Sequence, residues 1–216
     1  MVSDDDVARV VAGAGAEMDP LLREMTDHGH ERGFPIVGPA AGRFLRVLAR
    51  TVDAERVFEF GSGFGYSAAW FAGALPADGE VVLTDYDGDN LDEAREFLAR
   101  GGHDDVARYV VGDARETYAA ASGPFDVVLI DAEKTRYVET FEVAREKLAD
   151  GGLVVADNML DGPLTPAEVA DALEGESVEN EHAAGIADYL AHVRDDPDFD
   201  TSVVPLGSGL AVSARV

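Results

Sequence analysis

Short apolar runs alternate with amphipathic segments along most of the chain. Several apolar residues in a row are typical of buried strands, whereas apolar residues recurring every three or four positions are typical of helices. The first five apolar runs, which predict strands, cover residues 57–60, 80–84, 106–111, 124–131 and 153–156. The segments with helical periodicity are two short helices within 4–33, and then 40–52, 68–72, 90–100 and 137–148. Strands that alternate with helices in this way predict a parallel sheet.

The end of the chain departs from this alternation. Residues 201–206 and 210–216 form two further strands joined only by the turn Gly207-Ser208-Gly209, so they must run antiparallel. The expected fold is therefore α/β, with a mostly parallel sheet and one reversed strand. The polar stretch before it carries at least one helix, at 180–193, on which we expect Tyr189 and His192 to face a site.

Three alternate glycines, Gly61, Gly63 and Gly65, follow the first predicted strand, and a helix follows them. A strand–glycine turn–helix unit points free backbone N–H groups at a ligand. The dinucleotide fingerprint G-x-G-x-x-G needs its third glycine one place later, where this chain has Tyr66. The form E-x-G-x-G-x-G, which begins at Glu59, resembles motif I of S-adenosylmethionine-dependent methyltransferases. A tight turn without a ligand is the alternative.

Acidic residues follow the second and third predicted strands. Asp85 ends the second strand 24 residues after Gly61, in the place where an open α/β fold binds ribose hydroxyls. Because Asp87 and Asp89 follow it, a solvated turn aspartate is the alternative, but the position at the strand end favours Asp85. Asp113 lies just past the third strand, on the same edge of the expected sheet.

Strands four and five deliver three polar residues, Asp131, Asp157 and Asn158, to the same rim of the sheet. Two carboxylates and a carboxamide are hard oxygen ligands that suit Mg²⁺, Ca²⁺ or Mn²⁺ rather than zinc or copper. Side chains that simply cap helices are the alternative. His28 and His30 could form a metal pair, but no third ligand lies nearby in the sequence, so surface histidines are favoured.

Length and composition set the broad class. A chain of 216 residues can bury a substantial core, and we expect one domain spanning residues 1–216, with the helical segment 1–40 packed on it. The absence of cysteine excludes disulfides, thiolate metal sites and a cysteine nucleophile. The N-terminus is acidic where a signal peptide would be basic, and no apolar run approaches membrane-spanning length. We therefore expect a cytoplasmic protein without a membrane partner.

The charge of the chain is extreme, with 43 acidic and 17 basic residues and a net charge of −26. The acidic residues are spread along the whole sequence, and only two of the basic residues are lysines, Lys134 and Lys147. An ordinary acidic protein would not explain the missing lysines. This composition is typical of proteins from extreme halophiles, in which salt screens the repulsion between carboxylates.

In the order of its motifs the chain resembles the cation-dependent O-methyltransferases, which include catechol and caffeoyl-CoA O-methyltransferases and small bacterial relatives. The resemblance covers roughly residues 34–216. The motifs that carry it are PIVGPAAGRFL, VFEFGSGFGYSA, the acid at Asp85, VGDA, FDVVLIDAEKTRY, GGLVVADN and LPLGSGLAVSAR. It implies a Rossmann-like class I methyltransferase fold, with a mostly parallel seven-stranded sheet, an antiparallel C-terminal hairpin and helices on both faces.

The resemblance also implies a site, residue by residue. The implied contacts to S-adenosylmethionine are Val37, Glu59, Gly61, Ser62, Gly63, Ser67, Asp85, Asp113, Ala114 and Asp131, with Asp113 at the adenine. The implied metal ligands are Asp131, Asp157 and Asn158, and the implied catalytic residues are Lys134, Asp131 and Asn158. The final turn is Gly-Ser-Gly where relatives usually have Gly-Asp-Gly, and residues 160–198 match only loosely, so the acceptor does not carry over.

The expected function is divalent-metal-assisted O-methylation of a small catechol- or phenol-like acceptor, in which a metal ion lowers the hydroxyl pKa and Lys134 serves as base or stabilising cation. Relatives are commonly dimers, so the resemblance implies a homodimer. One alternative is a hydroxylated tRNA uridine as acceptor, which the net charge opposes, although high salt weakens that argument. Another is a module that binds S-adenosylmethionine without catalysis. The presence of all four polar residues, Asp131, Lys134, Asp157 and Asn158, disfavours it. An NAD-dependent oxidoreductase is disfavoured by the glycine spacing and the terminal hairpin.

Overall fold

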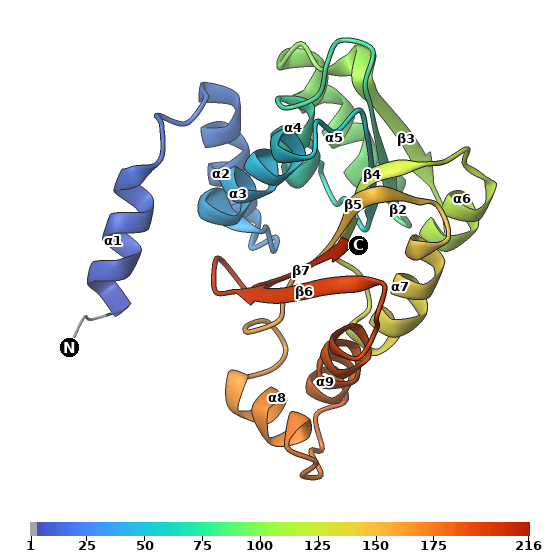
Figure 1. The fold of residues 1–216 in the computed structure, drawn as a ribbon. Coiled ribbons are helices and arrows are strands. Elements are labelled where there is room, and N and C mark those ends of the chain that lie inside the picture. The colour runs from blue at the N-terminus through green and yellow to red at the C-terminus, as the bar shows by residue number, and fades with distance from the viewer. Residues whose placement is uncertain (1–3) are drawn as a thin grey trace.

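Residues 4–216, which the computed structural model describes, are organised around a seven-stranded sheet (Figure 1). The strands are β1 (Arg56–Phe60), β2 (Glu80–Asp85), β3 (Ala107–Val111), β4 (Phe125–Ile130), β5 (Leu148–Ala156), β6 (Phe199–Val204) and β7 (Leu210–Arg215). Their order in the sheet is β3-β2-β1-β4-β5-β7-β6. The pairs among β1 to β5 are parallel, and β7 is antiparallel to both β5 and β6. The predicted parallel sheet with an antiparallel C-terminal hairpin is confirmed.

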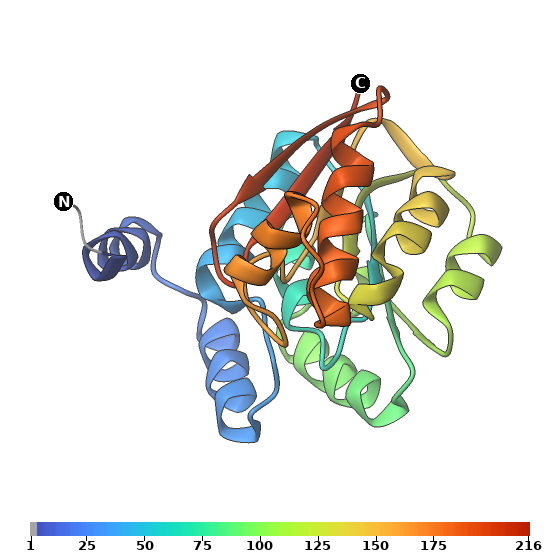
Figure 2. The same cartoon turned by 90° about the horizontal axis from the view of Figure 1, so that it is seen from below.

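Helices cover both faces of this sheet, as Figures 1 and 2 show. The α-helices are α1 (Asp4–Ala14), α2 (Pro20–Arg32), α3 (Gly38–Thr51), α4 (Tyr66–Ala72), α5 (Gly88–Arg100), α6 (Ala114–Ala120), α7 (Tyr137–Arg145), α8 (Pro166–Leu173) and α9 (Glu181–Arg194). Short 3₁₀ turns, η1 (Asp104–Val106) and η2 (Lys134–Arg136), precede β3 and α7. Helices α2 to α5 bury their apolar residues against one face, and α6 to α9 bury theirs against the other.

Alternate residues of the central strands enter these two cores. In β1, Val57 belongs to the core under α2 to α5, whereas Phe58 and Phe60 belong to the core under α6 to α9. Neighbouring β4 divides in the same way, with Leu129 in the first core and Ile130 in the second. Parallel strands with both faces covered bury almost every side chain, which explains why these runs are mostly apolar; Glu59 in β1 is a buried exception.

Strand β5 differs from its expected bounds. It begins at Leu148, whereas the sequence predicted a helix to residue 148 and a strand from residue 153. Helix α7 ends at Arg145, and Gly151, with φ of 72°, lies inside the strand. The pairing of β4 with β5 shifts register between Phe125 and Val127, so the early part of β5 is irregular. A glycine-rich sequence is typical of such an irregularity and equally typical of a helix cap.

Helix α2 packs into the core, whereas helix α1 projects from the rest of the protein. Asp19 caps α2 through a hydrogen bond from the Leu21 N–H, and α2 buries Leu22 and Met25 in the core. Helix α1 contacts α3 but extends away from the body in Figures 1 and 2. Residues 1–3 of the expected N-terminal segment lie outside the described residues. Among the described helices, none has the length and apolar character needed to cross a membrane.

Lys147 joins two elements of the fold. Its ammonium group donates hydrogen bonds to the carbonyl oxygens of Tyr118, Ala119 and Ala121, at 2.9, 2.6 and 2.7 Å. These carbonyls end α6, where the backbone lacks helical partners. The predicted helix 137–148 extended too far, because α7 ends at Arg145, before Lys147, and the Lys147 side chain turns inward to cap α6.

Candidate active site

Two adjoining cavities lie where the parallel strands end. The first has a volume of about 260 Å³ and is lined by the ends of β2 and β3 and by the start of α6. The second has a volume of about 240 Å³ and is lined by the glycine turn and by residues 34–37. Gly61, Asp85 and Ala132 line both cavities, so the two form one elongated site. Ligands of open α/β sheets bind in this position.

Most of the predicted site residues line these cavities. Those in the first cavity are Gly61, Asp85, Asp113 and Ala114. Those in the second cavity are Val37, Gly61, Ser62, Gly63, Ser67, Asp85, Asp131 and Lys134. The lining of neither cavity includes Glu59, Asp157 or Asn158, which lie in β1 or just after β5.

The glycine turn is shaped by protein contacts as well as by room for a ligand. Gly61 has φ of 87°, and a Cβ atom there would lie 2.2 Å from the Asp131 carbonyl oxygen. Only glycine fits this close approach between the end of β1 and the end of β4. The Gly63 N–H donates a hydrogen bond of 2.9 Å to Oδ2 of Asp85, which ties the turn to β2. The turn therefore holds the ends of three neighbouring strands together.

Asp85 lies at the junction of the two cavities. Besides the Gly63 N–H, its carboxylate accepts a hydrogen bond of 2.8 Å from the Asp87 N–H. Two carboxylate oxygens offer about four acceptor positions, so lone pairs remain for hydroxyl donors of a ligand. The Asp85 carboxylate is thus held in place by the backbone and still has free acceptor positions for ligand hydroxyls.

At the far end of the first cavity, Asp113 caps α6 and pairs with Arg115 at 3.0 Å. The hydrogen bond from the Arg115 side chain holds the pKa of Asp113 well below its usual range. Arg115 also pairs with Glu139 at 3.0 Å, and Tyr86, 72% exposed, lies on the cavity wall. Neither Arg115 nor Tyr86 was predicted from the sequence, although each directly follows a predicted site residue, Ala114 or Asp85.

Glu59 lies in the centre of β1 as a fully buried carboxyl group. Among residues 4–216, neither of its side-chain oxygens has a hydrogen-bond partner of standard geometry. Burial raises its pKa to about 8, and the nearby hydroxyls of Ser67 and Ser62 oppose that shift. A buried acceptor without a partner is costly, so this group is suited to a donor supplied from outside the chain.

A charged cluster closes the second cavity. The Lys134 Nζ lies 3.7 Å from Asp131 Oδ1 and donates a hydrogen bond of 3.3 Å to the Ala132 carbonyl. Asp157 is 2% exposed, and its Oδ1 has no partner within residues 4–216. Burial, reinforced by the charge of Asp131, raises the pKa of Asp157 to about 7. Burial also raises the pKa of Asp131, although Lys134 opposes the shift.

Asn158 follows Asp157 in an unusual backbone conformation. Its φ is 64°, in the left-handed region that asparagine tolerates better than most residues other than glycine. The hydroxyl of buried Tyr137 donates a hydrogen bond of 3.2 Å to the Asp157 carbonyl oxygen. Burial, with the charges of Asp131 and Asp157, raises the pKa of Tyr137 well above its usual range, so this hydroxyl stays a donor. Tyr137 was not predicted from the sequence as a site residue, although it ends the motif DAEKTRY.

The donor set fits a hard divalent cation. Asp131 is close enough for its charge to raise the pKa of Asp157, and the Asp157 Oδ1 lacks a partner within residues 4–216. Two mutually repelling carboxylates with an amide residue beside them suit Mg²⁺, Mn²⁺ or Ca²⁺, which prefer oxygen ligands. The buried, unpartnered Glu59 oxygens fit a cofactor that donates hydrogen bonds, and the backbone N–H groups of the turn fit one that accepts them.

Three histidine and tyrosine positions lie away from this site. Tyr189 packs its ring against Tyr137 and Phe141 rather than lining a cavity, so the expectation that it faces the site was wrong. His28 binds Glu93 at 3.1 Å and packs against Phe64, which makes it a structural residue. The third position, His192, belongs to a separate cluster.

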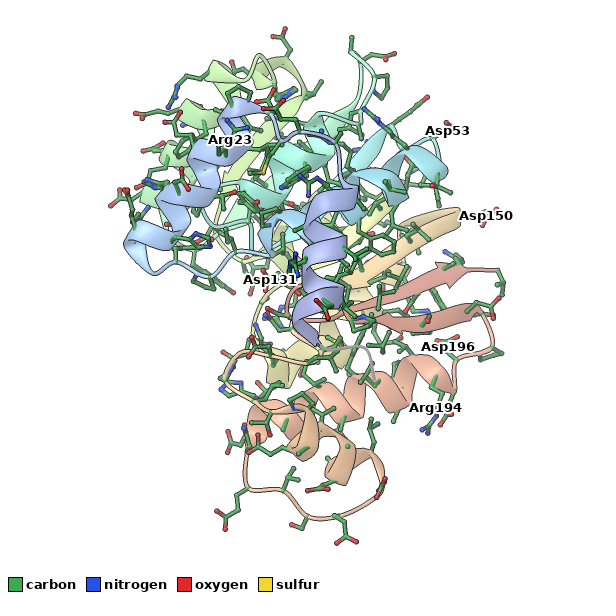
Figure 3. All side chains as sticks on the ribbon, turned by 90° about the vertical axis from the view of Figure 1, so that its left-hand side faces the viewer. Arg23, Asp53, Asp131, Asp150, Arg194 and Asp196 are labelled. Atoms are coloured by element: carbon green, nitrogen blue, oxygen red, sulfur yellow. The ribbon has the colours of Figure 1, made fainter. Side chains whose placement is uncertain are left out.

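Within residues 4–216, one group of histidine and acidic side chains has ligand atoms all within 4.8 Å of one another: Glu142, His192 and Asp196. Arg145 pairs with both carboxylates and supplies the positive charge, so we interpret this group as an ion-pair cluster. Figure 3 shows Asp196 at the end of α9, well apart from Asp131. The expectation that His192 faces the predicted site was therefore wrong.

This sheet, with its glycine turn and its cavities at the strand ends, has the architecture of the Rossmann-like class I methyltransferases. The cofactor-bound structure of Rv0187 from MTB superposes with a TM-score of 0.84 at 27% identity, covering 100% of this chain and 98% of that chain. The O-methyltransferase family model matches residues 14–216, so the chain belongs to that family and is a methyltransferase enzyme.

Named enzymes are similar to the chain in sequence. The catechol O-methyltransferase of Niastella koreensis is 35% identical over 152 residues, which cover 68% of each chain. That of Mycobacterium tuberculosis is 37% identical over 157 residues, which cover 71% of each chain.

Proposed function

We propose that the protein transfers the methyl group of S-adenosylmethionine to a hydroxyl of a small catechol- or phenol-like molecule, with the help of a divalent cation. The observation that carries this proposal is the cluster of Asp131, Lys134 and Asp157 beside the glycine turn. It places oxygen ligands and an ammonium group next to the cavity that a methyl donor would occupy.

The form of the site supports this cofactor. A nucleoside joined to an amino acid needs two connected compartments, and the two cavities meet at Gly61, Asp85 and Ala132. In this arrangement Asp85 binds the ribose hydroxyls, while Asp113 and Ala114 lie at the adenine. The residues for the methionine part are Val37, Glu59, Ser62, Gly63, Ser67 and Asp131.

Asp131, Asp157 and Asn158 would hold the cation, which when bound supplies Lewis acidity and orients the acceptor. The chain's own residues do the rest. Held in line, the acceptor oxygen bonds to the methyl carbon while the carbon–sulfur bond breaks and its electron pair goes to sulfur. Lys134, 15% exposed at the cavity wall, takes the hydroxyl proton or steadies the anion. The products are a methyl ether and a neutral thioether.

Methyl-transfer assays over a panel of catechols, phenolic esters and hydroxylated tRNA test the proposal. We expect turnover of a small hydroxylated acceptor, loss of turnover in EDTA and recovery with Mg²⁺ or Mn²⁺. Asp157→Ala should abolish the metal-dependent turnover while leaving cofactor affinity largely intact.

Asp150→Ala is the matched control, since Asp150 is an exposed carboxylate on the same strand, away from the strand end that carries the site. Full activity of wild type and Asp157→Ala in EDTA would rule out metal assistance. Turnover of the tRNA alone would replace the small acceptor.

A further inference from the structure

Tyr137 lies beneath the proposed metal site and contacts two parts of it. It is fully buried at the start of α7, and its hydroxyl donates a hydrogen bond of 3.2 Å to the carbonyl oxygen of Asp157. Its ring lies below the ammonium group of Lys134, with 5.9 Å between Nζ and the ring centroid. One buried side chain therefore touches a proposed ligand residue and the proposed proton acceptor.

The carbonyl that Tyr137 holds belongs to the peptide between Asp157 and Asn158. The Asp157 N–H still donates to the Ile130 carbonyl of β4, at 3.0 Å, as a strand residue would. At Asn158 the chain leaves the strand through a left-handed conformation, with φ of 64°. The Tyr137 hydroxyl thus fixes the peptide plane at which the strand ends and the turn begins.

The chain after the turn is also held. The N–H groups of Met159 and Leu160 donate to the carbonyl oxygens of Gly209 and Ser208, at 3.1 and 2.7 Å. Backbone hydrogen bonds therefore fix the segment before Asp157 and after Asn158. The contact at its centre, where the orientation of both side chains is decided, comes from the Tyr137 hydroxyl.

We propose that Tyr137 is a positioning residue for the divalent cation, because its hydroxyl fixes the Asp157–Asn158 peptide so that both side chains point toward one ion. The inference rests on the proposed metal-assisted function. Tyr137 touches neither cofactor nor acceptor, so it acts through Asp157 and, by its ring, through Lys134. Groups that orient metal ligands typically change metal affinity by about 10- to 100-fold when removed.

Tyr137→Phe keeps the buried ring and removes only the hydroxyl, so the peptide at Asp157 loses its anchor. We expect Mn²⁺ to bind about tenfold more weakly or worse, measured by calorimetry or by the electron paramagnetic resonance of free Mn²⁺. Affinity for S-adenosylhomocysteine should stay unchanged, because the glycine turn is untouched. Saturating Mn²⁺ should restore most of the lost turnover, which a general loss of stability would not allow.

Tyr189→Phe is a matched control. Tyr189 is fully buried, its ring lies 5.7 Å from that of Tyr137, and its hydroxyl has no hydrogen-bond partner of standard geometry within residues 4–216. Removing this hydroxyl should leave Mn²⁺ affinity at the wild-type value. An equal loss in both variants would overturn the specific role of Tyr137.

Asp157→Ala tests the proposed metal site separately from the role of Tyr137. If wild type binds Mn²⁺, Asp157→Ala does not, and Tyr137→Phe binds like wild type, the role of Tyr137 is overturned while the metal site stands. If Asp157→Ala binds Mn²⁺ as well as wild type does, the proposed metal site itself is wrong, and the inference fails with it. Weak binding in Tyr137→Phe together with wild-type binding in Tyr189→Phe supports the inference.

Discussion

Lys134 is one of only two lysines in a chain whose other 15 basic residues are arginines. The second lysine, Lys147, converges its three donors on three carbonyls, for which a compact ammonium group is better suited than a planar guanidinium. Lys134 donates to one backbone carbonyl, that of Ala132, and lies 3.7 Å from the carboxylate of Asp131. Arginine could have met a requirement for positive charge alone at this position. We therefore infer that Lys134 is needed because its ammonium group can release a proton.

Lys134→Arg tests this inference, because a guanidinium keeps the charge but does not release its proton. We expect the variant to fold and to bind cofactor and metal as wild type does, while kcat falls about a hundredfold or more, the usual scale of general acid–base catalysis. Steady-state kinetics across pH measures the effect. Near wild-type turnover at every pH would show that any cation in this position is sufficient.

Glu59 gives a prediction about pH and stability. Burial raises its pKa from 4.5 to about 8, so between these values the folded state holds a proton that the unfolded state has released. The free energy of unfolding of the protein without ligands should therefore fall as pH rises through this window, by up to about 1.4 kcal/mol per pH unit from this group. Glu59→Gln should flatten the decline.

Thermal melts between about pH 5 and pH 8 compare the slopes. Glu55→Gln is the control, since Glu55 is an exposed carboxyl just before the same strand. We expect that control to keep the wild-type slope. Parallel curves for wild type and Glu59→Gln would mean that another group, or none, holds the proton.

At the scale of elements, the central strands were predictable because their burial on both faces leaves a continuous apolar run. The positions of β1 and β4 follow directly from residues 57–60 and 124–131. The early part of β5 was missed, because Asp150 and the two glycines after it are equally typical of a helix cap. Whether these residues form a strand or a cap depends on their pairing with β4, which shifts register there. The two strands are distant in sequence, so local patterns do not show this pairing.

Two short helices also escaped prediction, for different reasons. Helix α8 had a usable signal: Thr165 and Glu168 form a capping box, with Pro166 at the first helical position. Helix α6 is only one to two turns long, and its end is held by Lys147 from beyond α7. Such a helix depends on tertiary contacts more than on its own sequence.

The polar residues at strand ends were predictable as a group, because the carboxyl ends of parallel strands meet at one edge of a sheet. That argument brought Asp85 and Asp131 to the observed cavities. It could not find Tyr137, whose contact with Asp157 joins residues 20 positions apart in sequence. Nor could it place Tyr189 correctly, since helical periodicity does not say which neighbour a buried face meets.

For the molecule as a whole, net charge is the dominant property. The net charge of −26 is spread over the surface, and the carboxylates at the periphery of Figure 3 come from every part of the chain. Helix α1 extends from this body and exposes Val7 and Val10, the latter 69% accessible. Exposed apolar residues on a projecting helix favour association, and the homodimer stays a prediction.

Such a charge should make stability depend strongly on salt. Repulsion among 43 acidic residues destabilises the compact state, and it is screened over about 10 Å at 0.1 M salt but about 3 Å at 1 M. We therefore expect the melting temperature, followed by circular dichroism, to rise continuously as KCl increases into the molar range. Sucrose at matched osmolality is the control, because it acts by exclusion from the surface without screening charge. An equal rise in sucrose would assign the effect to exclusion, and a melting temperature independent of KCl would remove the interpretation of this composition as halophilic.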